Sequence, residues 1–208
     1  HRGYNRKEVT QIQTTFTHFF DQVLGAGRVT VVGEVGFAHV GGLESKSDLR
    51  YGRDSIYGLD TPEYGNDGFV TANSWGYRLR ALADYSNVFA GVNLTPNVSF
   101  SHDVHGYGPN GLFNEGSKAV SVGVDAVYQN SYTASLSYTD FFGGDYNTLV
   151  DRDFLALSMG VNIIFAAIIV TGNLELWHIY VTAVLRSLLM AFDGPARQAL
   201  LPSLIPEK

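Results

Sequence analysis

Charged side chains recur at alternate positions of several strand-like segments, and their chemistry suits a surface in contact with water. The set is Glu34, Arg78, Arg80, Asp84, Asp103 and Asp125. Successive side chains of a strand point to opposite faces, so these residues share the face opposite the apolar one. In a closed barrel they would line the lumen, where charges tune selectivity. Alternatively they only keep a polar interior hydrated, and the sequence leaves both interpretations open.

Two other groupings resemble metal sites but lack the required geometry. His102 and His105 lie three residues apart on a predicted strand, which directs them to opposite faces. A polar stretch near residue 150 lacks the ligand order and the glycine of an EF-hand loop. Its members are Asp145, Asn147, Asp151 and Asp153. The chain has no cysteine, and no spacing supports a Ser/His/Asp arrangement. We therefore expect no metal, no cofactor and no enzymatic activity.

The composition argues against a nucleic-acid-binding protein. Charged residues make up only 16% of the 208 residues, and the formal net charge is -6. No basic patch stands out, so we expect no nucleic-acid partner. Aromatic residues are frequent at 13%, and there are 23 glycines. The chain opens with His1 and a polar run, with no visible signal peptide. We expect it to be a piece of a longer protein.

Seven segments alternate apolar and polar residues, as strands with two different faces do. Most span roughly 10–14 residues, whereas a globular strand averages about 5–6 and a tilted membrane strand needs about 9–11. Short and long connections alternate between them, and residues 41–73 form a long polar loop. The segments are 9–24, 29–40, 74–87, 92–105, 118–130, 132–142 and 153–163.

These lengths predict a mainly β protein, an antiparallel meander from a transmembrane β-barrel that is incomplete in this chain. The alternative is a soluble β-sandwich or lipocalin-like barrel, in which the apolar face would be the core. Alternation alone does not separate the two. The Ser, Thr, Gly and Asn residues of the second face suit a wet lumen, and Tyr and Trp near strand ends suit the aromatic girdles of membrane barrels.

Residues 1–162 resemble the C-terminal part of the DUF1302 family of Gram-negative outer-membrane proteins of uncharacterised function. The resemblance rests on FSHD (100–103), FNEG (113–116), FFGGDYN (141–147) and DRDF (151–154). It implies a predicted β-barrel in the bacterial outer membrane. Family members are longer, so most of the barrel would be missing on the N-terminal side. Seven strands do not close a barrel that normally has an even number.

Residues 163–208 resemble a different family, the major facilitator superfamily exporters. LWHIY (176–180) and AFDGPARQALLPSLIP (191–206) carry this resemblance, in which Asp193, Pro195 and Arg197 match the transporter motif. It implies a short α-helical tail of inner-membrane type. Arg186 departs from the pattern, and a charge in mid-helix costs about 2.5–3.5 kcal/mol on insertion scales. The join near Ile163 predicts a fused or mis-assembled reading frame, with a genuine two-part protein as the alternative.

The sequence therefore predicts two regions, a partial barrel over 1–162 and a helical membrane segment over 163–208. We expect membrane lipid as the partner and passage of small or apolar solutes as the function. Two alternatives stay open, a fragment of an exporter and a soluble β-sheet binding protein.

Overall fold

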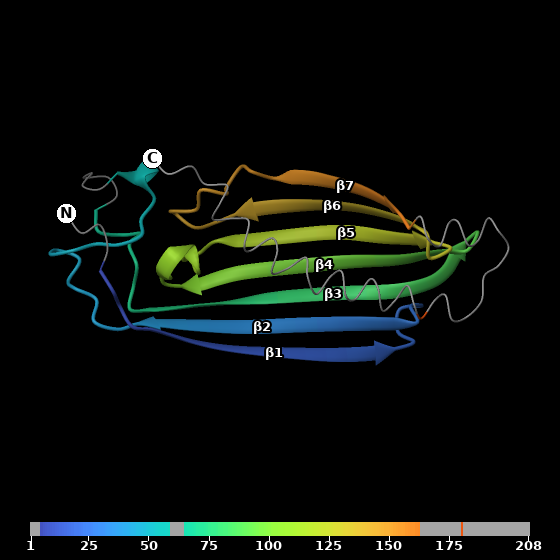
Figure 1. The fold of residues 1–208 in the computed structure, drawn as a ribbon, viewed down its shortest axis with the longest axis horizontal. Helices are drawn as coiled ribbons and strands as arrows, with labels where there is room; N and C mark the ends of the chain where they lie inside the picture. The colour runs from blue at the N-terminus through green and yellow to red at the C-terminus, as the bar shows by residue number, and fades with distance from the viewer. Residues whose placement is uncertain (1–4, 59–64, 163–179, 181–208) are drawn as a thin grey trace. The chain divides into compact units, whose positions relative to one another are not determined.

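The computed structural model describes residues 5–58, 65–162 and Tyr180. Contacts divide the chain into two units, His1–Gly160 and Val161–Lys208, and the first unit is described below. It is a single antiparallel sheet whose seven strands follow one another in chain order (Figure 1). The strands are β1 (Val9–Asp21), β2 (Arg28–Val40), β3 (Asn73–Phe89), β4 (Val92–His105), β5 (Lys118–Tyr128), β6 (Tyr132–Phe142) and β7 (Phe154–Val161).

The predicted strands are confirmed, and the differences lie at their ends. β1 ends at Asp21 rather than at residue 24, because Gln22 and Leu24 adopt positive φ in the turn that follows. β3 runs on to Phe89, through a register shift between Tyr85 and Phe89. The described part of the predicted long loop after β2 contains a short 3-10 helix, Ser55–Tyr57.

The sheet is open within the described residues, because neighbouring strands pair in sequence order and β1 and β7 form its two edges. A mainly β antiparallel meander is thus shown, whereas closure into a barrel is not. The predicted helical tail lies outside the described residues except for Tyr180, which is helical. In the part of the chain that the structure describes, no helix is long and apolar enough to cross a membrane.

The connections differ sharply between the two ends of the sheet. At one end, which we call the turn end, the connections are residues 22–27, 90–91 and 129–131. The shortest is the two-residue turn of Ala90 and Gly91, whose φ values of 48° and 83° suit the primed turns of tight hairpins. At the other end, which we call the loop end, the connections are residues 41–72, 106–117 and 143–153 (Figure 1).

A small core lies at the loop end. Ala38, Val40, Phe69 and Phe113 are buried there. The guanidinium of Arg53, itself buried, donates hydrogen bonds to the backbone oxygens of three loop residues, Gly58, Gly65 and Asp67, at 2.7–3.1 Å. It also stacks over the Phe69 ring, 4.1 Å from its centroid. These contacts order a long connection that carries few apolar residues.

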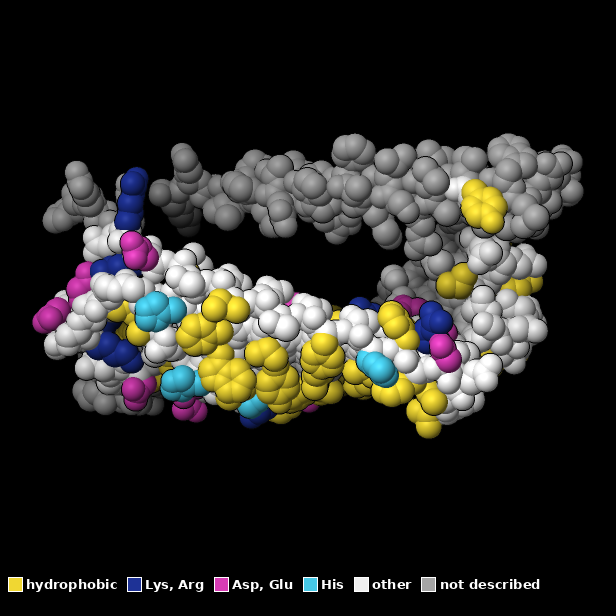
Figure 2. Space-filling view, turned by 90° about the horizontal axis from the view of Figure 1, so that it is seen from below, with side chains coloured by type: hydrophobic (Ala, Val, Ile, Leu, Met, Phe, Trp, Pro, Cys, Tyr) yellow, Lys and Arg dark blue, Asp and Glu magenta, His cyan; other side chains and the backbone are white. Residues whose placement is uncertain are grey.

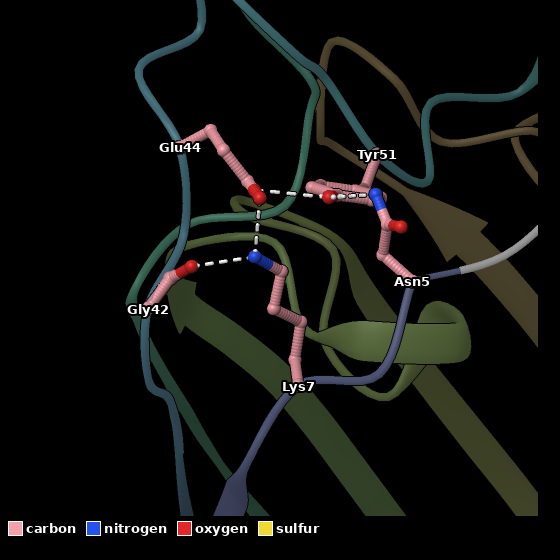
Figure 3. A network of polar contacts seen from close by, with 5 residues as sticks. All are labelled: Asn5, Lys7, Gly42, Glu44 and Tyr51. Atoms are coloured by element: carbon pink, nitrogen blue, oxygen red, sulfur yellow. Dashed lines mark hydrogen bonds and ion pairs between the residues drawn. The ribbon is translucent and has the colours of Figure 1, made fainter.

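A polar network ties the start of the chain to the same loop (Figure 3). Lys7 Nζ donates to the Gly42 oxygen and to Glu44 Oε1, both at 2.6 Å. The Tyr51 hydroxyl donates to Glu44 Oε2 at 2.9 Å, and Asn5 Nδ2 donates to that hydroxyl at 3.1 Å. Lys7 lowers the pKa of the Glu44 carboxyl by hydrogen bonding, and the same contact raises the pKa of Lys7.

Between the two ends, large apolar side chains of the sheet stay exposed. Figure 2 shows hydrophobic side chains spread along the middle of one side, while most charged ones gather toward the ends. Val122 is 58% exposed, Leu136 43% and Tyr138 47%. The Phe16 ring lies across Gly33 of the neighbouring strand and buries it, because that position carries no side chain. The apolar face is therefore covered by no second layer of described residues.

Candidate functional site

The register of the sheet brings the predicted charged residues to one face, which we call the polar face. Glu34 on β2 pairs with Arg78 on β3, and Arg78 pairs in turn with Ser101 on β4. Two residues further along β3, toward the turn end and on the same face, Arg80 pairs with Ser99 on β4. The row of residues beside Arg80 continues through hydroxyl groups across three strands, Ser99, Ser121 and Thr139.

The six charged residues are not equivalent, because two of them form an ion pair. Arg78 Nη2 donates to Asp103 Oδ1 at 2.7 Å. The other Asp103 oxygen accepts from the backbone N–H of Asn114 at 2.9 Å, and the Asp103 carbonyl accepts from Gly116. Asp103 is buried and joins β4 to the connection that follows it. It lies on the predicted face, but its carboxylate holds a loop in place.

The other three carboxylates are held mainly by hydroxyl and amide groups. Asp125 accepts from Ser135 Oγ at 2.5 Å and from Asn97 Nδ2 at 3.1 Å. Asp84 accepts from Thr95 Oγ1 at 3.1 Å, near the turn end of the polar face. Glu34 accepts from Thr15 Oγ1 at 3.3 Å.

Arg80 lies where two hollows of the polar face meet. The larger hollow, of about 510 Å³, is lined by Glu34, Arg78 and Arg80 together with four hydroxyl-bearing residues and the apolar Val32, Leu79, Phe100 and Ala119. The smaller, of about 240 Å³, is lined by Arg80, Asp125 and the serines between them. Ser99 and Ser121 line both. Among the described residues, no carboxylate forms an ion pair with Arg80, whereas Arg28 is paired with Asp21 and Arg78 with Asp103.

Burial on the two faces of β4–β6 is the reverse of that in a soluble sheet. The hydroxyl groups of Ser99, Ser121 and Thr139 are half-buried in the hollows of the polar face. The valine beside Ser121 on the other face, Val122, is exposed. In a soluble sheet the apolar face is packed on a core and the polar face is solvated. Here the polar face is the more enclosed one.

The loop-end cluster escaped prediction from the sequence. Arg53 and Phe69 belong to one connection and Tyr146 to another, and nothing in a polar loop marks one arginine as buried. The rings of Tyr57 and Tyr107 meet the Tyr146 ring at 5.1 and 5.7 Å between centroids. Burial raises the pKa of Tyr107 to about 12. The abundance of tyrosine in these loops is the only signal the sequence offered.

The remaining predicted sites are placed as follows. His102 lies on the apolar face and His105 at the end of β4, and no group of three potential metal ligands occurs in the described part of the chain. The loop of Asp145, Asn147, Asp151 and Asp153 caps local backbone; Asp153, for example, accepts from the Phe141 N–H at 3.1 Å. The transporter-like residues Asp193, Pro195 and Arg197 lie outside the described residues.

The fold and the polar face together define an antiparallel β-meander protein with long strands, one apolar face and one charged, hydroxyl-rich face. The sequence profile of a protein family of unknown function, DUF1302, matches residues 1–163, and the chain belongs to this family. No curated protein and no solved structure matches the chain.

Proposed function

We propose that this chain is part of an outer-membrane β-barrel whose polar face lines a passage for small solutes. The observation that carries the proposal is the reversed burial of the two faces, with exposed apolar side chains opposite a half-buried polar row. Lipid would cover the apolar face, as in membrane barrels with an outward apolar band and a polar interior.

The strand lengths support the same proposal. β1–β6 have 11–17 residues each, which meets the roughly 9–11 residues needed for a tilted strand to cross a bilayer. Short turns at one end and long connections at the other are also the arrangement of outer-membrane barrels. The ordered loop end would then face the outside of the cell.

The direction of the edge strands bears on how such a barrel closes. Each strand of the meander reverses direction, so β1 and β7 run the same way. Direct pairing of these edges would be parallel, and a closed, fully antiparallel barrel needs an odd number of further strands between them. In lipid the unpaired edge groups are costly, which makes completion by additional strands a requirement of the proposal.

Single cysteines test the proposal directly, because the chain has none of its own. Ser121→Cys and Val122→Cys place thiols on adjacent residues of opposite faces in the reconstituted protein. We expect a charged, water-soluble thiol reagent to label the first and not the second. Brominated lipids should quench a fluorophore on the second only. Rapid labelling of Val122→Cys by the charged reagent would contradict a lipid-facing apolar side and favour the soluble alternative.

The alternative of an exporter fragment rests on residues 163–208, which lie almost wholly outside the described residues. It stays a prediction, separate from the barrel proposal. Membrane fractionation distinguishes the two, because heat-modifiable mobility in the outer-membrane fraction supports the barrel and an inner-membrane location supports the exporter fragment.

A further inference from the structure

We propose that the polar face carries a binding site for a small hydroxylated carboxylate, with Arg80 as its anion-binding residue. The inference rests on the proposed function and names a solute class for the same surface. Three observations carry it: the position of Arg80 between the two hollows, the ion pairs that hold Arg28 and Arg78 on the same face, and the chemistry of the residues that line the hollows.

The first observation is that Arg80 has its guanidinium available. Asp103 holds Arg78 at 2.7 Å, and Asp21 holds Arg28 at 2.8 Å. Among the described residues Arg80 has no such partner, although it lines both hollows. A guanidinium presents several N–H donors in a planar fork that matches the two oxygens of a carboxylate.

The second observation is that a row of hydroxyl-bearing residues starts beside Arg80 and lines the same hollow. Ser99 lies opposite Arg80 in the register, and Ser121 and Thr139 continue the row. Thr139 Oγ1 donates a hydrogen bond to Ser121 Oγ at 3.0 Å, so Thr139 positions the Ser121 hydroxyl. Hydroxyl groups both donate and accept hydrogen bonds, which suits a ligand that carries hydroxyls beside its carboxylate.

The carboxylates of the polar face restrict where an anion can bind. Glu34 lines the larger hollow, and its carboxylate repels an anion bound at Arg80. Asp125 lines the smaller hollow and already accepts from Ser135 and Asn97. A bound carboxylate therefore fits best at Arg80, with its hydroxylated part directed along the serines. Removing Glu34 should strengthen binding and removing Arg80 should weaken it.

The test uses the full chain in detergent micelles, with gluconate, acetate and glucose as probes. Binding is followed through the Nε–H resonances of ¹⁵N-labelled arginine. We expect gluconate to shift one arginine resonance saturably, and that resonance to be absent in Arg80→Gln. The variant Arg80→Gln should bind gluconate at least about tenfold more weakly, whereas Glu34→Gln should bind it more tightly. Acetate has the carboxylate without the hydroxyls, and glucose has the hydroxyls without the carboxylate. Both should therefore bind more weakly than gluconate.

Arg28→Gln is the matched control, because it removes a positive charge from the same face at a paired position. We expect it to leave gluconate affinity unchanged. Equal loss in both arginine variants, or unchanged affinity in Arg80→Gln, would overturn the inference. The cysteine labelling above reports on the barrel proposal alone. Lipid-facing labelling with unchanged binding in Arg80→Gln would therefore reject the site and leave the barrel standing.

Discussion

The loop end and the middle of the sheet are stabilised in different ways. At the loop end, connections of 11–32 residues converge on buried groups such as Arg53, Phe69 and Asp103. In the middle, side chains such as Val122 and Leu136 stay exposed, and the strands are joined chiefly by their backbone hydrogen bonds and by neighbours on the same face. The first region packs on itself, whereas the second leaves apolar side chains of one face exposed.

The largest expected effect is at the loop end, in Arg53→Ala. The substitution removes the donor of the hydrogen bonds to the backbone oxygens of Gly58, Gly65 and Asp67, and it removes the stacking on Phe69. Hydrogen bonds to a charged group contribute about 1.5–3 kcal/mol, so we expect a loss of roughly 3 kcal/mol in the free energy of unfolding. Urea unfolding followed by tryptophan fluorescence measures it. Arg152→Ala, an exposed arginine of another connection, is the control, and equal losses would contradict the packed loop end.

The next largest effect is expected when an arginine is placed on the apolar face rather than on the polar face. Val122→Arg should lower the free energy of unfolding in vesicles by about 2 kcal/mol, because an arginine on a lipid-facing strand costs about 2–4 kcal/mol at the midplane and less away from it. Ser121→Arg should cost much less, since it faces the polar hollow. Urea titrations in lipid vesicles compare them. A soluble sheet would give the reverse order, because Val122 is already exposed to its surroundings.

A smaller effect is expected on the apolar face of β1. Phe16→Ala uncovers Gly33 and the backbone around it, which the ring now shields. Aromatic cross-strand pairs contribute about 0.2–1 kcal/mol, so the loss should lie in that range. The exposed Phe19, on the polar face of the same strand, provides the control Phe19→Ala. An equal loss in both variants would mean that the Phe16–Gly33 contact has no special role.

Alkaline titration offers a further test of burial at the loop end. The raised pKa of Tyr107, about 12, means that its hydroxyl keeps its proton in the folded state after unfolded tyrosine has lost it. The associated stability is fully present below the ordinary tyrosine pKa of 10.0 and is lost as the pH rises toward 12. Tyrosine absorbance at 295 nm should show a late component that Tyr107→Phe removes. An unchanged late component in Tyr107→Phe would assign it to another tyrosine.

The smallest effect concerns the exposed pair of Lys7 and Glu44. Glu44 has a lowered pKa, so its contribution is present above the ordinary value of 4.5 and is lost as the pH falls. Lys7 has a raised pKa, so its contribution is present below 10.5 and is lost as the pH rises. Glu44→Gln should therefore flatten the acid limb of the stability curve slightly. A change at neutral pH that exceeds that of Arg53→Ala would contradict this ranking.

Strand positions could be predicted from the sequence because alternation is a local property. β4 and β6 have the predicted bounds, residues 92–105 and 132–142, and the charged residues from Glu34 to Asp125 fall on one face by parity alone. The ion pair of Arg78 with Asp103 could not be predicted, because it depends on the register of β3 against β4, which shifts between Tyr85 and Phe89 in a way that no local pattern encodes.

The sequence by itself determined where the strands lie and which residues share a face, since both follow from a repeat of two along an extended chain. Only the tertiary structure decided which charges are neutralised and which stay available. Arg78 and Arg80 are two residues apart on the same face, yet only Arg78 reaches Asp103. The physical reason is that an ion pair depends on the distance between atoms of different strands, and that distance is set by register and by the packing of the loops.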